Sequence, residues 1–173
     1  MNEIIQAMKE RKSCKKYKDT MVSETDINEI IEAGTYAASG QGKQGYIIIA
    51  ITNKEVRDAL SKENAAVMNA SIDPFYGAPV VIAVLKDNTV RTGEDDAALV
   101  IGNMLLAASS KGLGSCWIHR AKEEFESEVG KKVLKDLGIE GDYTGVGNCI
   151  IGYPEGELHP DVARKDNRVY YVK

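Results

Sequence analysis

The stretch that spans residues 95–119 has the most distinctive pattern of apolar and polar positions in the chain. No charged residue occurs between Ala97 and Ser110, and apolar residues face every side of a helical projection. A helix that is apolar all round is a buried helix. This one is shorter than the roughly 20 apolar residues needed to cross a bilayer. We therefore predict a central helix in a hydrophobic core, and no membrane partner.

Signals at both ends support this helix. Thr92 and Asp95 have the spacing of a capping box. Lys111-Gly112 offers a cation at the negative pole, followed by a glycine that can adopt a positive φ. Ser115–Ile118 then reads as a short strand. Asn103 is a polar residue in the middle of the helix, and it needs hydrogen-bond partners if it is buried.

The rest of the chain is predicted to form helices and strands around this centre. Helical spacing or capping residues predict helices at residues 2–9, behind Ser23, behind Asn53 and at residues 123–137. Continuous apolar runs predict buried strands at residues 46–51, 80–85 and 146–152. A polar tail follows, and residues 168–172 read as a last short strand.

These elements mix without strict alternation, which favours an α+β fold. We predict one domain over residues 1–173, with a small mixed or antiparallel sheet flanked by helices. The length of 173 residues suits one domain or one protomer of an obligate oligomer. The strand at residues 168–172 lies far from the compact core in sequence, so we expect it to pair with another subunit.

The composition of the chain indicates which partners are unsuitable and in which cellular compartment the protein is expected. The net charge of -4 gives no broad basic surface, which argues against nucleic acid as a partner. The three cysteines are far apart, and such an odd, sparse number argues for a reducing compartment rather than a disulfide framework. The amino-terminal segment is amphipathic and charged, unlike a signal peptide. We therefore expect a cytoplasmic protein.

A dense group of cations follows the first predicted helix. Arg11, Lys12 and Lys15 surround Ser13. Arginine can hold a phosphate through two parallel hydrogen bonds, lysine adds charge, and serine adds a neutral donor. One interpretation is therefore a site for a phosphate dianion. The other is a solvated helix end, whose cations complement the helix dipole.

A pair of glycines offers a second candidate motif. Gly112-x-Gly114 resembles the start of a dinucleotide-binding fingerprint. However, Trp117 stands where the third glycine belongs, and the run enters a strand instead of opening a helix. A glycine that simply ends the preceding helix explains the pair better.

Cysteine and histidine residues suggest two further hypotheses. Cys116, His119, Cys149 and His159 contain one Cys-x-x-His spacing, without the second pair of a typical metal site. Cys116 and His119 could also form a thiol nucleophile with its base, although no orienting third group is apparent. The alternative is that the cysteines are ordinary buried core residues.

Four segments, in this order, resemble the motifs of one family. Residues 11–17 (Arg-Lys-Ser-Cys-Lys-Lys-Tyr) are similar to an opening Arg-Arg-Ser-Ile-Arg-x-Tyr, and residues 37–40 with Gln44 are similar to an Ala-Pro-Ser-Gly-x-Asn-x-Gln-Pro-Trp loop. Residues 96–118 resemble its central helix and following strand. Residues 152–154 (Gly-Tyr-Pro) and Arg164-Lys165 resemble its closing elements. The chain thus resembles the nitroreductase family of FMN-dependent oxidoreductases over nearly its whole length.

The resemblance implies an intertwined homodimer with two FMN molecules at the interface and a central helix in the dimer core. Contacts to the flavin phosphate and ribityl chain are implied for Arg11, Lys12, Ser13, Lys15, Arg164 and Lys165. Residues implied to border the isoalloxazine ring from the second subunit are Ala38, Ser39, Gly40 and Gly42. Residues implied to line its other side, with a backbone N–H near N5, are Trp117, Ile118, His119 and Arg120. Asn103 would lie near the interface or keep an ordinary role within the chain.

The chain departs from the family pattern at several of these positions. Ala38 replaces the usual proline, and Gly42 replaces an asparagine whose side chain contacts the flavin. His119 and Arg120 replace small or acidic residues beside N5. An Arg120 that faces the ring would favour the anionic reduced flavin or an anionic substrate, whereas an Arg120 turned to solvent would favour neither.

The resemblance implies an oxidoreductase that uses NADH or NADPH to reduce small acceptors, such as nitroaromatics or quinones, by a ping-pong hydride transfer. The flavin would carry the redox chemistry, and no side chain stands out as a catalytic acid or base. Two alternatives are a flavin-binding sensor or carrier with little turnover, and an interaction module without flavin. The fold itself does not select the acceptor or the nicotinamide.

Overall fold

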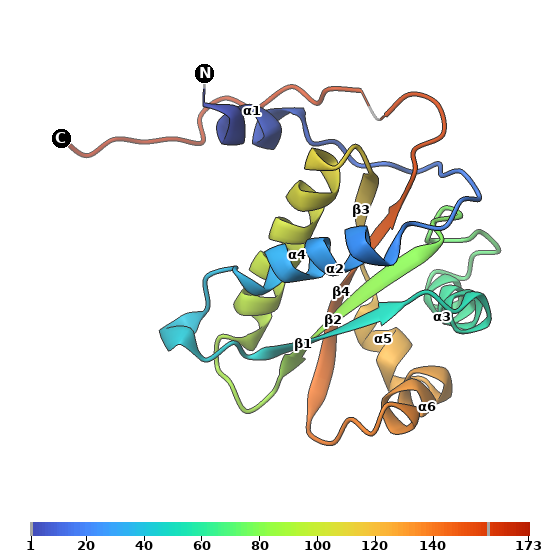
Figure 1. Ribbon diagram of the computed structural model, residues 1–173. Coiled ribbons are helices and arrows are strands. Elements are labelled where there is room, and N and C mark those ends of the chain that lie inside the picture. Colours follow the sequence, from blue (N-terminus) through green and yellow to red (C-terminus); the bar gives the residue numbers. More distant parts are fainter. Residues whose placement is uncertain (1, 159) are drawn as a thin grey trace.

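A four-stranded antiparallel sheet lies between two groups of helices (Figure 1). The computed structural model describes residues 2–158 and 160–173. The strands are β1 (Tyr46–Ile51), β2 (Val80–Asp87), β3 (Gly114–Ile118) and β4 (Tyr143–Gly152), in the spatial order β1-β2-β4-β3. β2 and β4 form the centre of the sheet, which explains their continuous apolar runs. The predicted α+β class with a small antiparallel sheet is confirmed.

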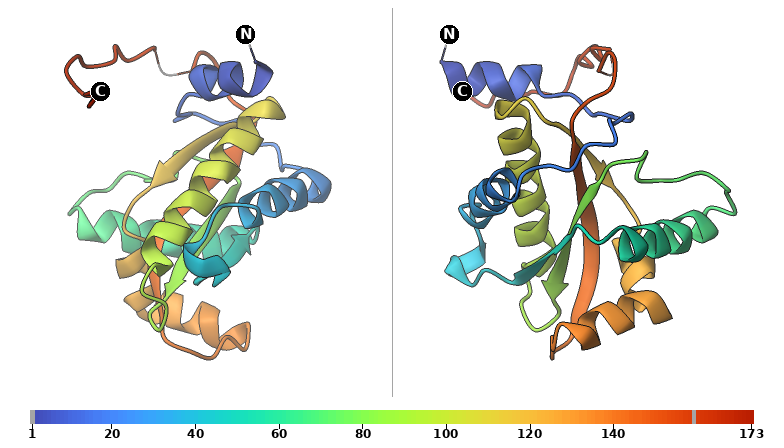
Figure 2. Two further views of the ribbon diagram at one scale, coloured as in Figure 1. Left: turned by 90° about the vertical axis from the view of Figure 1, so that its left-hand side faces the viewer. Right: turned by 45° about the vertical axis from the view of Figure 1, so that its right-hand side comes forward.

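Helices cover both faces of the sheet and create two separate cores (Figure 2). One face carries α2 (Glu24–Thr35) and α4 (Gly93–Ser110), and the other carries α3 (Lys54–Val67), α5 (Ala121–Glu126) and α6 (Glu128–Asp136). Side chains alternate along β2 accordingly. Val81 and Leu85 join the core on the α3 side, whereas Ile82 and Val84 join the core on the α4 side.

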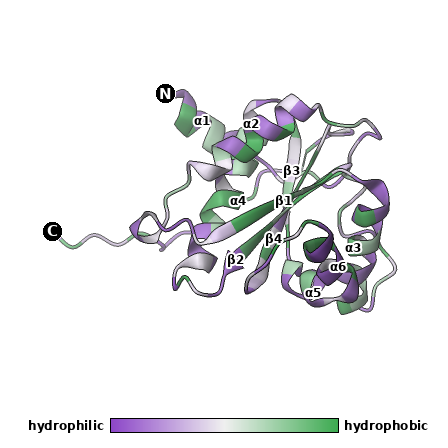
Figure 3. Ribbon diagram, turned by 60° about the horizontal axis from the view of Figure 1, so that its bottom comes forward, coloured by the Kyte–Doolittle hydropathy of each residue, from purple (hydrophilic) through white to green (hydrophobic). Residues whose placement is uncertain are grey.

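α4 is the central helix that the sequence predicts. Val100 and Met104 are fully buried, and Figure 3 shows α4 coloured mainly as hydrophobic. Gly112 follows the end of the helix with a φ of 72°, as a glycine helix stop requires. Asn103 donates from Nδ2 to the carbonyl oxygen of Ala33 at 3.1 Å. Asn103 therefore has a role within the chain, where it ties α4 to the end of α2.

The start of α4 differs from the predicted capping box. The helix begins at Gly93, and Thr92 has φ -94° and ψ 8°, a conformation in which its hydroxyl caps no backbone N–H. The hydroxyl instead lies 3.4 Å from a carboxylate oxygen of Asp96. Acidic side chains in the first turn, including Glu94, still complement the positive end of the helix dipole.

The helix predicted at residues 123–137 is two helices. Ser127 separates α5 from α6 with an extended conformation, φ -71° and ψ 165°. Its hydroxyl oxygen accepts a hydrogen bond from the N–H of Gly130 at 3.2 Å, and so caps the start of α6. A periodic apolar pattern continues across this break, which is why periodicity alone did not reveal it.

Both ends of the chain leave apolar side chains in contact with solvent. The helix α1 (Glu3–Glu10) exposes Ile4 by 62% and Met8 by 58%. In the single chain, residues 168–172 form an extended tail without a strand partner (Figure 1), so the predicted strand that pairs with another subunit stays a prediction. Tyr170 and Tyr171 on this tail are 82% and 80% exposed. No helix among the described residues combines the length and apolar character that spanning a membrane requires.

Candidate functional site

The cationic segment after α1 is fastened to the edge of the sheet. Ser13 forms a parallel bridge with Ser115 of β3, and the N–H of Cys14 donates to the carbonyl oxygen of Ser115 at 2.8 Å. Tyr17 is buried, and its hydroxyl donates to the carbonyl oxygen of Cys14 at 2.8 Å. With Cys14 and Tyr17 directed into the core, the intervening cations are left on the outer side.

A cavity of about 230 Å³ is lined by Arg11, Lys12 and Lys15 of this segment together with the C-terminal tail. The lining residues that the sequence predicts are Arg11, Lys12, Ser13, Lys15 and Arg164. Lys9 and the carboxylate of Asp161 also belong to the wall, so cations outnumber acids among the lining residues. The site thus joins residues about 150 positions apart in sequence. Lys165 does not line the cavity, although it follows Arg164 directly on the exposed tail.

Two contacts fix individual cations at this cavity. Lys12 lies 3.1 Å from a carboxylate oxygen of Asp161, an ion pair that holds the tail over the opening. The ammonium group of Lys15 lies 5.7 Å from the centre of the Tyr76 ring, within the range of a cation–π contact. Such a group of Arg, Lys and Ser donors matches the geometry and charge of a phosphate.

The thiol of Cys116 is buried beside this cavity. Burial raises the pKa of Cys116, although a hydrogen bond with Ser13 and the charges of Lys15 and Arg11 act in the opposite direction. A thiolate is the reactive form of cysteine, and a raised pKa disfavours it. Burial and the raised pKa favour the interpretation of Cys116 as an ordinary core residue over that of a nucleophile.

The hypothesis of a metal site is wrong, because two of its proposed ligands point to opposite faces of the sheet. Cys116 belongs to the core on the α3 side of the sheet, whereas Cys149 belongs to the core on the α4 side. Two ligands on opposite faces of a sheet cannot share one ion. His159 lies outside the described residues, and within them no group of three potential ligands is suited to a metal ion.

The far end of β3 leads into the turn predicted to line the flavin. Trp117 and Ile118 point to opposite faces of the sheet, since Trp117 packs on the α4 side and Ile118 on the α3 side. The rings of Trp117 and His119 meet edge to face with centroids 6.2 Å apart. His119 is exposed, and Arg120 has a φ of 76° in the left-handed region. Trp117 and Ile118 therefore end the strand on its two faces, whereas His119 and Arg120 form the turn, so the four residues do not make one continuous wall.

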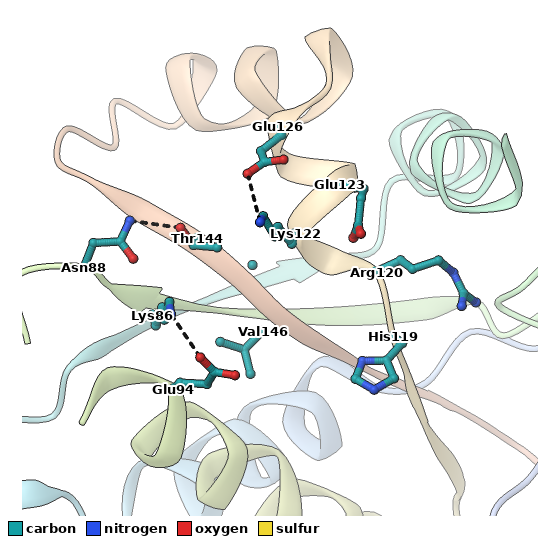
Figure 4. A pocket seen from close by; sticks show the side chains of 11 residues that line it. Lys86, Asn88, Glu94, His119, Arg120, Lys122, Glu123, Glu126, Thr144 and Val146 are labelled. Atoms are coloured by element: carbon teal, nitrogen blue, oxygen red, sulfur yellow. Dashed lines mark hydrogen bonds and ion pairs between the residues drawn. The ribbon is translucent and has the colours of Figure 1, made fainter. Parts of the chain in front are cut away.

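Arg120 does not follow the expectation of a side chain turned to solvent. Its Nε donates to Oδ1 of Asn64 at 2.7 Å, so the guanidinium group packs against α3 instead of lying free in solvent. His119 and Arg120 also border a polar cavity of about 660 Å³ (Figure 4). Ion pairs between Lys86 and Glu94 and between Lys122 and Glu126 compensate most charges along its wall.

Asn64 and Glu124 belong to a buried polar network that sequence reasoning missed. Both are fully buried, as is Asn148 of β4. Asn64 donates from Nδ2 to Glu124 and to the carbonyl oxygen of His119, the latter at 2.7 Å. Burial raises the pKa of Glu124 to about 7, while hydrogen bonds from the two asparagines and the charge of Arg120 favour the ionised form. No sequence motif marks these residues, because they lie on three separate elements.

The loop with Ala38, Ser39, Gly40 and Gly42 is held by the amino end of α4. The carboxylate of Asp96 accepts hydrogen bonds from the N–H groups of Gly40 at 2.9 Å and Gly45 at 3.2 Å. Asp96 is itself buried. Figures 1 and 2 show the short helix η1 (Gly40–Gly42) at the opposite end of α4 from α1. Within one chain, the structure therefore does not bring this loop to the cationic cavity.

The fold and the cationic cavity define an α+β protein with a site suited to a phosphorylated ligand. The family model described as "Nitroreductase family" matches residues 8–153. The chain therefore belongs to the nitroreductase family, and the resemblance of its motifs is confirmed.

Solved structures and a curated relative agree with this assignment. A nitroreductase with bound FMN from Bacteroides fragilis is 26% identical, has a TM-score of 0.88, and covers 100% of both chains. A nitroreductase with bound FMN from Desulfitobacterium hafniense is 28% identical, with the same TM-score and coverage. A putative NADH dehydrogenase/NAD(P)H nitroreductase from Archaeoglobus fulgidus is 27% identical over 91% of this chain and 88% of its own length.

Proposed function

We propose that this protein is an FMN-dependent oxidoreductase that takes a hydride from NADH or NADPH and passes electrons to small acceptors, such as nitroaromatics or quinones, in a ping-pong cycle. The observation that supports this most is the joint cavity of Arg11, Lys12, Ser13, Lys15 and Arg164. The FMN-bound relatives from Bacteroides fragilis and Desulfitobacterium hafniense support the choice of ligand. A cytoplasmic location, inferred from the sparse cysteines, is part of the same proposal.

The residues of this chain fit a flavin mononucleotide. The cationic cavity would hold its phosphate through charge-assisted hydrogen bonds. β3 leads from Ser115, beside that cavity, to His119, and four residue steps of a strand span about 13 Å. An elongated ligand anchored at the first end would therefore present its ring system at the second. The bound flavin would supply the hydride chemistry, and the protein would supply its position and surrounding charge.

The active unit in this proposal is a homodimer. In one chain, α1 and the tail expose large apolar side chains, among them Ile4 and Tyr170. Contiguous apolar surface of this kind marks an interaction site. The partner subunit's Ala38, Ser39, Gly40 and Gly42 would complete the flavin site, which explains why this loop lies away from the cationic cavity of its own chain. Exchange of the tail between protomers would bury residues 168–172.

We expect sedimentation equilibrium of the FMN-loaded protein to give the mass of two chains. Removing residues 168–173 should shift this equilibrium toward monomers, because the tail would lose its contacts with the partner. A parent protein that stays monomeric at micromolar concentrations, and yet retains FMN, would contradict the shared site.

We expect purified protein to be yellow and to lose its visible flavin absorbance when NADH or NADPH is added without oxygen. Addition of a quinone or nitroaromatic should restore the absorbance. Protein that stays colourless after incubation with FMN would refute the proposal. Bound FMN that neither nicotinamide reduces would instead favour the sensor or carrier role.

A further inference from the structure

The turn at the end of β3 contains a residue in an unfavourable backbone conformation. Arg120 has φ 76° and ψ 16°, in the left-handed region. A side chain with a Cβ rarely occupies this region unless the surrounding structure determines it. Neighbouring groups must therefore hold the turn.

Asn64 of α3 makes the contacts that hold it. Nδ2 of Asn64 donates to the carbonyl oxygen of His119 at 2.7 Å, and Oδ1 accepts from Nε of Arg120 at 2.7 Å. One fully buried amide thus binds two consecutive residues of the turn, one through its backbone and one through its side chain. The same Nδ2 also donates to the carboxylate of Glu124.

Glu124 keeps the amide of Asn64 in this orientation. The side-chain amide of Asn64 has an acceptor oxygen and a donor nitrogen. Because the carboxylate of Glu124 accepts a hydrogen bond, it keeps the nitrogen of Asn64 on its side. Nδ2 of Asn148, which lies opposite Ile118 in β4, donates to both carboxylate oxygens of Glu124 at 3.0 Å. The N–H of Glu124 donates to the carbonyl oxygen of Arg120 at 3.0 Å. The carboxylate is therefore connected to the turn through Asn64, whereas the backbone N–H of Glu124 bonds the turn directly.

A fully buried carboxylate is costly, and an apolar core at this position would be expected to be at least as stable. The charged groups close enough to influence it are Arg120, which is attracted, and Glu123, which is repelled. Of its two side-chain partners, Asn64 binds the turn itself and Asn148 lies opposite Ile118 at the end of β3, which indicates a role in fixing that turn.

We propose that Asn64 and Glu124 are positioning residues that fix the backbone of His119 and Arg120 against the flavin ring. This inference rests on the proposed function, in which that turn borders the flavin. The two residues do not contact the phosphate cavity, so they act on the orientation of the ring environment and not on retention of the cofactor.

The test compares Asn64→Ala with Ser61→Ala in the FMN-loaded protein. Ser61 lies one turn earlier on α3, is also buried, and donates from Oγ to Asp73 at 2.6 Å, away from the turn. The readouts are FMN content, the reduction potential of bound FMN, hydride transfer from NADH in single turnover, and amide hydrogen exchange of residues 118–121.

Asn64→Ala is expected to retain FMN within about threefold, because the charge-assisted phosphate contacts are unchanged. It should slow hydride transfer at least about tenfold, since a displacement of about 1 Å at a reacting centre can cost more than this. It should also shift the flavin potential and accelerate exchange at residues 118–121. Ser61→Ala should lose some thermal stability but keep the rate, potential and exchange of the parent.

If Asn64→Ala does not fold, Asn64→Ser keeps a hydroxyl donor near Glu124 and should show smaller changes of the same sign. Asn64 variants that match Ser61→Ala in potential, rate and exchange would overturn the positioning role. A parent protein that binds no FMN would instead refute the proposed function, so the two failures are distinguishable.

Discussion

Replacing Arg11 and Lys15 together by alanine is expected to weaken FMN binding by about 10²- to 10⁴-fold. Both side chains line the cavity that also contains Ser13 and Arg164. A hydrogen bond to a charged group contributes about 1.5–3 kcal/mol, so two such contacts contribute about 3–6 kcal/mol. A factor of ten in affinity corresponds to about 1.4 kcal/mol. Titration of apoprotein with FMN, followed by flavin fluorescence, measures the change.

The matched control is the double variant Lys16→Ala with Lys18→Ala, which also removes two positive charges from this segment. Both lysines are exposed and neither lines the cavity; Lys16 pairs with Glu155 instead. The control should change FMN affinity less than about threefold at physiological ionic strength, where exposed charges are screened. Equal losses in both double variants would show that net charge, not a specific site, determines binding. Unchanged affinity in both would favour a solvated helix end.

Sequence reasoning succeeded where local rules determine the structure. Capping at Ser23 and Asn53 is confirmed, because in each case the side-chain oxygen accepts from an N–H of the first turn. The buried strands and the central helix follow from apolar runs that no other arrangement could bury. The cationic segment stood out by its composition, which left a phosphate site and a solvated helix end open, and the resemblance to the family then favoured the phosphate site.

The parts that could not be predicted depend on contacts between distant segments. The path of the tail past α1, which brings Arg164 to the cavity, has no local signal in the sequence, so Arg164 was predicted only from the resemblance to the family. The two expectations for Arg120 considered the flavin and the solvent but not a third partner, Asn64, 56 positions away. The carboxylate of Asp96, in the first turn of α4, holds the N–H groups of Gly40 and Gly45, which lie more than 50 positions away in sequence.

Strand β3 runs between the two parts of the proposed flavin site. Its first residues pair with the segment that carries the cations, and its last residues lead into the turn held by Asn64. A single edge strand therefore sets the separation between the proposed phosphate site and the proposed ring site.

Glu124→Gln is expected to remove a pH dependence of stability that the parent shows between about pH 4.5 and pH 7. Burial raises the pKa of Glu124 from its ordinary 4.5 to about 7. Between these two pH values the folded state therefore keeps a proton on Glu124 that the unfolded chain releases. The protonated side chain gives the folded state its full stability below pH 4.5, and this stability is lost as the pH rises through about 7. The difference between the two pKa values corresponds to about 3 kcal/mol.

Glutamine fits the same site without a charge. Its oxygen can accept from Nδ2 of Asn64 and from Nδ2 of Asn148, as Oε1 of the carboxylate does. At pH 8 the variant should therefore be more stable than the parent, whereas at pH 5 the two should be similar. For a chain of this size, about 3 kcal/mol corresponds to roughly 6–12 °C in melting temperature.

Melting temperatures of parent and variant at pH 5 and pH 8, with protein and FMN concentrations held constant, measure this effect. Glu126→Gln is the control, because it makes the same chemical change on the same helix at an exposed residue 4.0 Å from Lys122. An exposed pair of this kind contributes at most about 1 kcal/mol, so this variant should follow the parent at both pH values. Parallel behaviour of parent and Glu124→Gln would mean that the carboxylate is ionised throughout, held in that state by Asn64, Asn148 and Arg120 against the cost of its burial.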